Sequence, residues 1–109
     1  MKLLIVGSRS ISEFDLKNHV TDDIDTIISG GAPGVDTLAE KFADENKLSK
    51  IILRPKYNIY GKCAPLKRNE ELVQMADKLL IIWDGKSKGS LYTIKYAKKL
   101  NKEMSVIVP

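Results

Sequence analysis

Five short, uninterrupted runs of apolar residues are spaced along the chain. They do not alternate with polar residues, and unbroken runs are typical of strands buried on both faces of a parallel sheet. The gaps of about 20 to 25 residues between runs leave room for the crossover helix that parallel pairing requires. The runs are Leu3–Val6, Ile27–Ile28, Ile51–Leu53, Leu79–Trp83 and Val106–Val108. This pattern predicts an α/β fold with an open parallel sheet of about five strands flanked by helices.

Helical periodicity occupies the gaps between these runs. Apolar residues from Val35 to Ala43 follow the i, i+3, i+4, i+7, i+8 spacing of one buried helix face. Shorter stripes run from Leu72 to Ala76 and from Leu91 to Leu100. Ser10 and Glu13 have the spacing of a capping box and predict that the first helix begins there.

Length and composition narrow the class of protein. A chain of 109 residues has room for one domain, so we expect a single domain over residues 1–109. Apolar residues make up 43% and charged residues 29%, which is typical of a globular protein. One cysteine, Cys63, excludes an internal disulfide and a zinc thiolate cluster, and one histidine, His19, removes most metal-site and Ser-His options. We therefore expect no metal site and no resident cofactor.

Charge and hydropathy indicate the kind of ligand and the cellular compartment to expect. Residues 1–40 carry three Lys/Arg against seven Asp/Glu, whereas residues 41–109 carry fifteen against seven. The basic excess is either a solvated helix surface or a potential that attracts an anionic ligand. The longest apolar run has five residues, far fewer than the ~20 of a membrane span. The segment Met1–Gly7 is too short for a secretory signal, so we expect a cytoplasmic protein with no membrane partner.

Six of the seven glycines fall in three places, each after a predicted strand and before a predicted helix. These places are Gly7, the group Gly30, Gly31 and Gly34, and the pair Gly85 and Gly89. Because the carboxyl ends of parallel strands share one edge, the three loops should converge on one crevice. A helix N-terminus there offers free N–H groups and a positive dipole end, which suits phosphate.

Hydroxyl and charged side chains accompany these glycines, with Arg9 placed to clamp a phosphate. The competing interpretation is that glycine is needed wherever a strand turns into a helix, and that Ser10, Asp36 and Ser90 only cap helices. Two familiar motifs are excluded. Residues 85–87 lack the upstream glycine of a P-loop, and residues 30–34 lack the G-x-G-x-x-G spacing of a nicotinamide site.

Four motifs in order, Gly7–Arg9, Ser29–Asp36, Arg68–Asn69 and Trp83–Ser90, resemble the YspA-like branch of the SLOG superfamily over nearly the whole chain. That superfamily is Rossmann-like and includes the LOG phosphoribohydrolases and the DNA-processing protein A family. The resemblance implies a domain that binds a nucleotide or a nucleotide-derived signal, such as an ADP-ribose or cyclic-nucleotide type ligand. It also implies a homodimer or homotetramer, and we expect Trp83, Tyr92 and Tyr96 to exceed what one small core buries.

The resemblance departs from the LOG enzymes at two positions. Arg68 matches their catalytic arginine, but Asn69 replaces the adjoining lysine, and Thr93 stands where they carry a catalytic glutamate. A threonine cannot act as that carboxylate. We therefore expect a sensor or sequestering protein, with a phosphoribohydrolase or N-glycosidase as the alternative. In that alternative the catalytic candidates are Arg68 and the carboxylates Asp36 and Asp84, which otherwise bind ribose hydroxyls or cap a helix.

Single-stranded nucleic-acid binding is a further alternative, suggested by the net charge of +4. Against it, the chain lacks an aromatic and basic stacking platform apart from Tyr57–Lys62, which lies within Arg54–Pro65, a stretch that its prolines and glycine predict to be a long loop. Tyr57 and Tyr60 in that loop either stack on a base or pack locally.

The expected ligand is thus a nucleotide or nucleotide-sugar, with a need for Mg²⁺ left open. The phosphate is expected at the first two glycine loops and Arg9. The expected contact residues are Gly7, Ser8, Arg9, Gly30, Gly31, Ala32, Gly34, Val35, Asp36, Arg68, Asn69, Asp84, Gly85, Ser87, Gly89 and Ser90.

Overall fold

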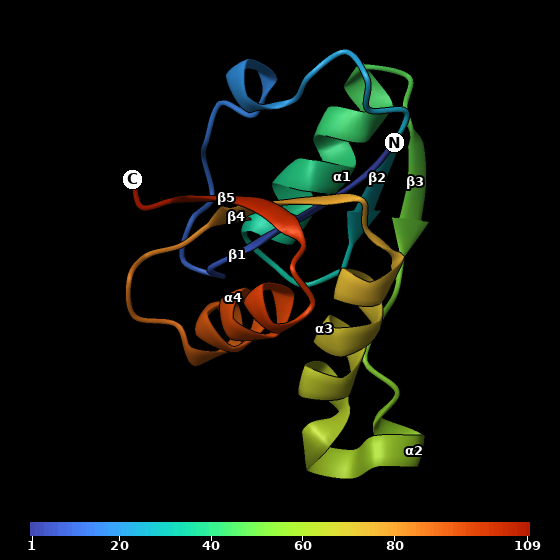
Figure 1. The fold of residues 1–109 in the computed structure, drawn as a ribbon, viewed down its shortest axis with the longest axis vertical. Helices are drawn as coiled ribbons and strands as arrows, with labels where there is room; N and C mark the ends of the chain where they lie inside the picture. Colours follow the sequence, from blue (N-terminus) through green and yellow to red (C-terminus); the bar gives the residue numbers. More distant parts are fainter.

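A computed structural model describes residues 1–109 and contains one five-stranded sheet in which every neighbouring pair is parallel. The strand order is β3-β2-β1-β4-β5, so the order reverses between β1 and β4 (Figure 1). The strands are β1 (Lys2–Gly7), β2 (Thr26–Ser29), β3 (Ser49–Ile52), β4 (Lys78–Ile82) and β5 (Glu103–Ile107). This confirms the predicted Rossmann-like α/β fold, with the last strand beginning three residues before the expected run.

Three longer helices cover the two faces of the sheet. Helix α1 (Val35–Glu45) lies on one face, and α3 (Ala64–Met75) and α4 (Lys88–Lys99) lie on the other (Figure 1). Successive strand residues point to opposite faces, so Leu3 and Ile5 pack with α1 while Leu4 and Val6 pack with α3 and α4. Both faces are therefore apolar, which is why the strand runs do not alternate.

The predicted helix from Ser10 does not form. Residues 8–25 cross the α1 face as irregular chain with a single 3₁₀ turn, Lys17–His19. The Ser10 hydroxyl donates to the Asp84 carboxylate, 3.1 Å away, instead of capping a helix. Leu16 and Ile24 still enter the core, so this connection covers the sheet with side chains but without helical backbone bonds.

The predicted loop over residues 54–65 is also wrong in part. After Arg54 the chain forms two short helical turns, α2 (Tyr57–Tyr60) and a 3₁₀ turn (Gly61–Cys63), before α3 begins at Ala64. Pro65 lies in the first turn of α3, where the missing N–H costs nothing. These turns project from the body of the molecule beside the N-terminal end of α3 (Figure 1).

The aromatic side chains expected to exceed the core are half-buried and find partners within the chain. The Trp83 indole N–H donates to the Ser87 carbonyl at 3.0 Å. On the outer side of α3 and α4, Tyr92 donates to Glu70 and Gln74 donates to Tyr96. Separately, none of the helices combines the length and apolar character that a membrane span needs.

Candidate functional site

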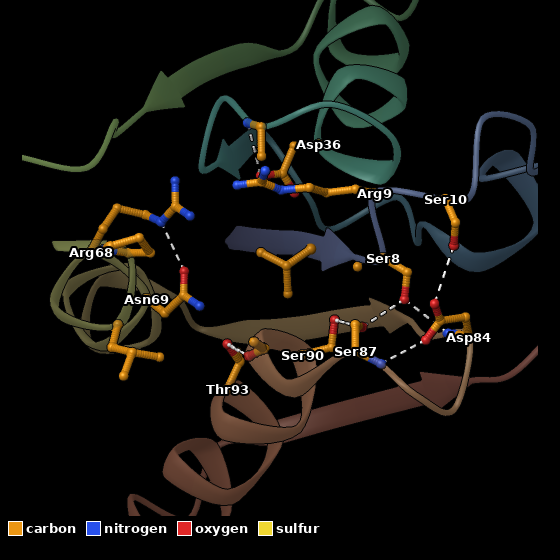
Figure 2. Close-up of a pocket in the computed structure, with 16 residues that line it drawn as sticks. Ser8, Arg9, Ser10, Asp36, Arg68, Asn69, Asp84, Ser87, Ser90 and Thr93 are labelled. Carbon is orange, nitrogen blue, oxygen red and sulfur yellow. Dashed lines mark hydrogen bonds between the residues drawn. The ribbon is translucent and has the colours of Figure 1, made fainter. Parts of the chain in front are cut away.

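A cleft of about 390 Å³ opens where the strand order reverses. Its walls come from the loops after β1, β2 and β4 and from the first turns of α3 (Figure 2). In open α/β sheets the crevice at such a reversal is the usual place for a ligand. The cleft thus brings together segments that are far apart in the sequence, as the glycine pattern predicted.

Most of the expected contact residues line this cleft, but five do not. Gly30, Gly31, Gly34, Val35 and Gly85 lie behind or beside it. Those that line it are Gly7, Ser8, Arg9, Ala32, Asp36, Arg68, Asn69, Asp84, Ser87, Gly89 and Ser90. Val6, Ser10, Pro65, Leu66 and Thr93 also line the cleft. Pro65 and Leu66 are not identified as site residues from the sequence, because the sequence predicts the end of a loop there and not the first turn of a helix beside the cleft.

Two of the glycines are required by close packing between loops. A Cβ on Gly34 would lie 2.6 Å from the carbonyl oxygens of Ser8 and Arg9, and the φ of Gly34 is +82°. A Cβ on Gly7 would lie 2.1 Å from the Ile82 carbonyl oxygen. The Val35 N–H also points at the Ser8 carbonyl, 3.5 Å away. The N-terminus of α1 is therefore packed against the loop after β1.

One end of the cleft, which we call the hydroxyl end, is formed by Ser8, Ser87 and Ser90. The Ser8 and Ser87 hydroxyls lie 2.9 Å apart, and Ser87 donates to the Ser90 hydroxyl at 3.2 Å. Ser87 precedes the first turn of α4 and its side chain makes no capping bond to the helix. The first N–H groups of α4 have no intrahelical acceptor, and Gly89 leaves open space beside them. The Ser8 and Ser87 hydroxyl protons are used within this chain of hydrogen bonds, so the donors left for an anion at this end are the first N–H groups of α4 and the Ser90 hydroxyl.

Asp84 shapes the hydroxyl end. Its carboxylate accepts the backbone N–H groups of Lys86 and Ser87, both at 2.8 Å, and the Ser10 hydroxyl. These backbone bonds lower the pKa of Asp84 to about 2, so the group is ionised at neutral pH. The Asp84 N–H donates to the Ser8 hydroxyl, 2.9 Å away, and so ties the loop after β4 to the loop after β1. Asp84 thus holds the loop after β4 in the conformation that forms this wall of the cleft.

The opposite end, which we call the guanidinium end, is formed by Arg9, Arg68 and Asn69 (Figure 2). The Arg68 side chain donates from Nε to the Asn69 side-chain oxygen at 2.8 Å and from Nη1 to the Gly30 carbonyl. A Cβ on Gly30 would lie 2.7 Å from Arg68 Nη1, so glycine there leaves room for the guanidinium. Arg68 is only 8% exposed, and burial lowers its pKa while Asp36 acts to raise it.

Asp36 lies beside the guanidinium end in the first turn of α1 and is 4% exposed. Its Oδ2 accepts the Ala32 N–H at 3.2 Å. Burial raises the pKa of Asp36 to about 6, although the Ala32 bond and the Arg68 charge act to lower it. A carboxyl group that titrates near neutrality in a cleft is able to hold or release a proton there.

Some residues singled out from the sequence lie apart from the cleft or are occupied. Tyr57 and Tyr60 are 58% and 40% exposed and do not line it. The Thr93 hydroxyl lines the cleft but donates to the Gly89 carbonyl at 3.0 Å.

Comparisons with models of protein families, with curated proteins and with solved structures find no match to this chain. The fold and the cleft define a class: a Rossmann-like α/β domain with a polar, anion-compatible cleft at the reversal of strand order.

Proposed function

We propose that the protein binds a nucleotide or a nucleotide-derived ligand in this cleft and acts by recognition, as a sensor or a sequestering protein. The observation that carries the proposal is the hydroxyl end, where three serine hydroxyls surround the N-terminus of α4. Hydroxyls and free helix N–H groups are the donors that hold phosphate in many α/β proteins. We therefore propose a phosphate at α4 rather than at the first two glycine loops, where the sequence predicts it, because the N-terminus of α1 is packed against the Ser8 carbonyl.

The resemblance to the YspA-like branch of the SLOG superfamily supports the same ligand class. Its motif residues Ser8, Asp84 and Ser87 are hydrogen-bonded to one another across the reversal of strand order. Such preorganised donors reduce the conformational entropy lost on binding.

Calorimetry with AMP, ADP-ribose and cyclic ADP-ribose tests this proposal. Gly89→Val places a branched side chain in open space beside the α4 N-terminus and should abolish binding while the protein stays folded. Lys95→Val introduces the same residue on the exposed side of α4 and serves as the control. Absence of binding by the unmodified protein to all three ligands, or equal binding by both variants, would contradict the proposal.

A second candidate function is hydrolysis of a nucleoside monophosphate with release of the base, and Asp36 favours it. A buried carboxyl group with its pKa raised to about 6 is suited to general acid or base work. Arg68 lies close to it and would hold the substrate, while Thr93 replaces the glutamate of the LOG enzymes. In this scheme water attacks the sugar carbon and the N-glycosidic bond breaks with a proton delivered to the base.

Chromatography of nucleoside monophosphates incubated with the protein tests hydrolysis. Release of free base that disappears in Asp36→Asn would establish an enzyme. If no base is released although calorimetry detects binding, the protein recognises its ligand without turning it over.

The protein is further proposed to act in the cytoplasm as a homodimer or homotetramer. Cys63 is a free, exposed thiol, which suits a reducing compartment. Tyr57, Ile59 and Val108 are each more than half exposed, and apolar side chains of this size are commonly covered in assemblies. Light scattering coupled to size-exclusion chromatography would measure the oligomeric state, and a monomer at all concentrations would overturn this part.

A further inference from the structure

The guanidinium end contains a buried cation whose hydrogen-bonding capacity is only partly used. Arg68 donates to Asn69 and Gly30 through Nε and Nη1, and its Nη2 has no partner within the chain. The Arg68 residue is 92% buried and lines the cleft as well as a smaller hollow beside Tyr60, and its Nη2 atom is not itself fully buried. A guanidinium nitrogen without a partner at the wall of the cleft is free to donate a charge-assisted hydrogen bond to a bound anion.

Asp36 does not neutralise this cation by an ion pair. The two side chains approach the same point beside Gly30, but no oxygen of Asp36 comes within 4.0 Å of an Arg68 nitrogen. Arg9 points across the cleft toward the same end (Figure 2). Two guanidinium groups, those of Arg9 and Arg68, therefore lie at this end of the cleft beside Asp36.

The two ends of the cleft are too far apart for one phosphate. Arg68 is held at the Gly30 carbonyl, beyond the end of β2, whereas Ser87 and Ser90 follow β4. Strand β1 lies between β2 and β4, so two strand spacings separate these positions, roughly 10 Å. A single phosphate spans about 8 Å between donors on opposite sides. Figure 2 likewise places Arg68 and Ser87 at opposite ends.

We propose that the cleft has two anion subsites, so that its ligand carries two phosphate groups, one at the hydroxyl end and one at Arg68 and Arg9. This inference rests on the proposed function and narrows the ligand from any nucleotide to a diphosphate or bisphosphate. Charge-assisted bonds from a buried guanidinium supply the added affinity.

Calorimetry on the full chain with AMP, ADP and adenosine 3′,5′-bisphosphate, and with the guanosine counterparts, tests the inference. We expect at least one doubly phosphorylated ligand to bind about tenfold or more tightly than the monophosphate of the same base. Arg68→Gln should remove that difference, because it weakens binding of the doubly phosphorylated ligand far more than binding of the monophosphate. Lys67→Gln removes the same charge from the neighbouring, exposed position on α3 and should change nothing.

Arg9→Gln provides a second test at an exposed position, in case Arg68→Gln fails to fold. Like Arg68→Gln, this variant should reduce the ratio between the affinity for the doubly phosphorylated ligand and the affinity for the monophosphate. Equal affinity for monophosphates and doubly phosphorylated ligands, or an equal loss of both in the arginine variants, would overturn the two subsites while leaving nucleotide binding intact. If none of the six nucleotides binds, and ADP-ribose and cyclic ADP-ribose do not bind either, the proposed function itself fails, and the two subsites with it.

Discussion

Single residues in the cleft are expected to serve the proposed binding at the expense of stability, and Gly89 is the simplest case. It lies in the first turns of α4, where glycine is a poor helix former, yet a Cβ there would meet no atom within 4 Å. Packing therefore does not require glycine at this position. Under the proposed function, the approach of a ligand to the helix N-terminus accounts for the absence of a side chain.

Gly89→Ala is expected to raise the free energy of unfolding by about 0.5–1 kcal/mol, because alanine loses less backbone entropy on folding. The same change should weaken nucleotide binding, since its methyl group occupies the space beside the α4 N–H groups. Urea unfolding and calorimetry on the same preparation would measure both quantities. A variant that loses stability would show that the space is needed by the fold.

Other glycines act through packing, and Gly34 and Gly85 form an informative pair. Both have a φ of +82°, but a Cβ on Gly34 would lie 2.6 Å from two backbone oxygens, whereas one on Gly85 would meet only Val108 at 3.9 Å. Gly85→Ala should cost about 1–2 kcal/mol from the backbone conformation alone. Gly34→Ala should cost clearly more, because two loops must also separate. Equal urea midpoints for the two variants would contradict this account.

At the scale of elements, local sequence is sufficient where a buried face is continuous. The strands are predicted because their apolar residues form unbroken runs that are buried on both faces of the sheet, and α1 is predicted because its apolar residues recur with helical spacing. The helix predicted from Ser10 does not form, because the Ser10 hydroxyl donates to Asp84, 74 positions away, instead of capping a helix. Pro65 indicates a loop in the sequence but lies in the first turn of α3, because proline is common both in loops and in the first turn of a helix.

The sequence predicts which loops form the candidate site, but it does not predict the side-chain contacts within the site. The glycine pattern indicates which strand ends converge, and it finds Ser8 and Ser87. It cannot indicate that Arg68 turns to the Gly30 carbonyl, 38 positions away, because that contact depends on how α3 packs. The glycine pattern also does not reveal that the Asp84 carboxylate accepts hydrogen bonds from backbone N–H groups of its own loop, whereas Asp36 is buried.

For the whole molecule, Asp36 makes stability depend on pH. Its pKa is about 6 in the fold against 3.8 for the free side chain, so the folded state binds the proton more tightly. Stability should therefore fall as pH rises from about 4 to about 6, by roughly 3 kcal/mol, and stay constant above. Asp36→Asn should remove this decline. Urea unfolding at several pH values measures it, and parallel curves for the two proteins would contradict the prediction.

Asp84 gives the opposite sign and serves as the comparison. Its pKa is lowered to about 2 by backbone N–H groups, so its contribution is present above about pH 4 and is lost as pH falls toward 2. Asp84→Asn should therefore lower the free energy of unfolding by a constant amount between pH 5 and 7, without changing the slope there, and should remove the part of the decline toward pH 2 that Asp84 causes. Urea unfolding over the same pH range measures both.

The irregular connection over residues 8–25 has a consequence for motion. The helices α1, α3 and α4 have continuous series of backbone hydrogen bonds, whereas this segment has only isolated ones, such as those from His19 to Leu16 and from Ile24 to Thr21. Its amides should exchange with deuterium well before those of the sheet, through openings that leave the rest of the protein folded. Since Ser8 and Arg9 begin this segment, a ligand that holds them should slow exchange along it, and the chain would stiffen as it becomes occupied.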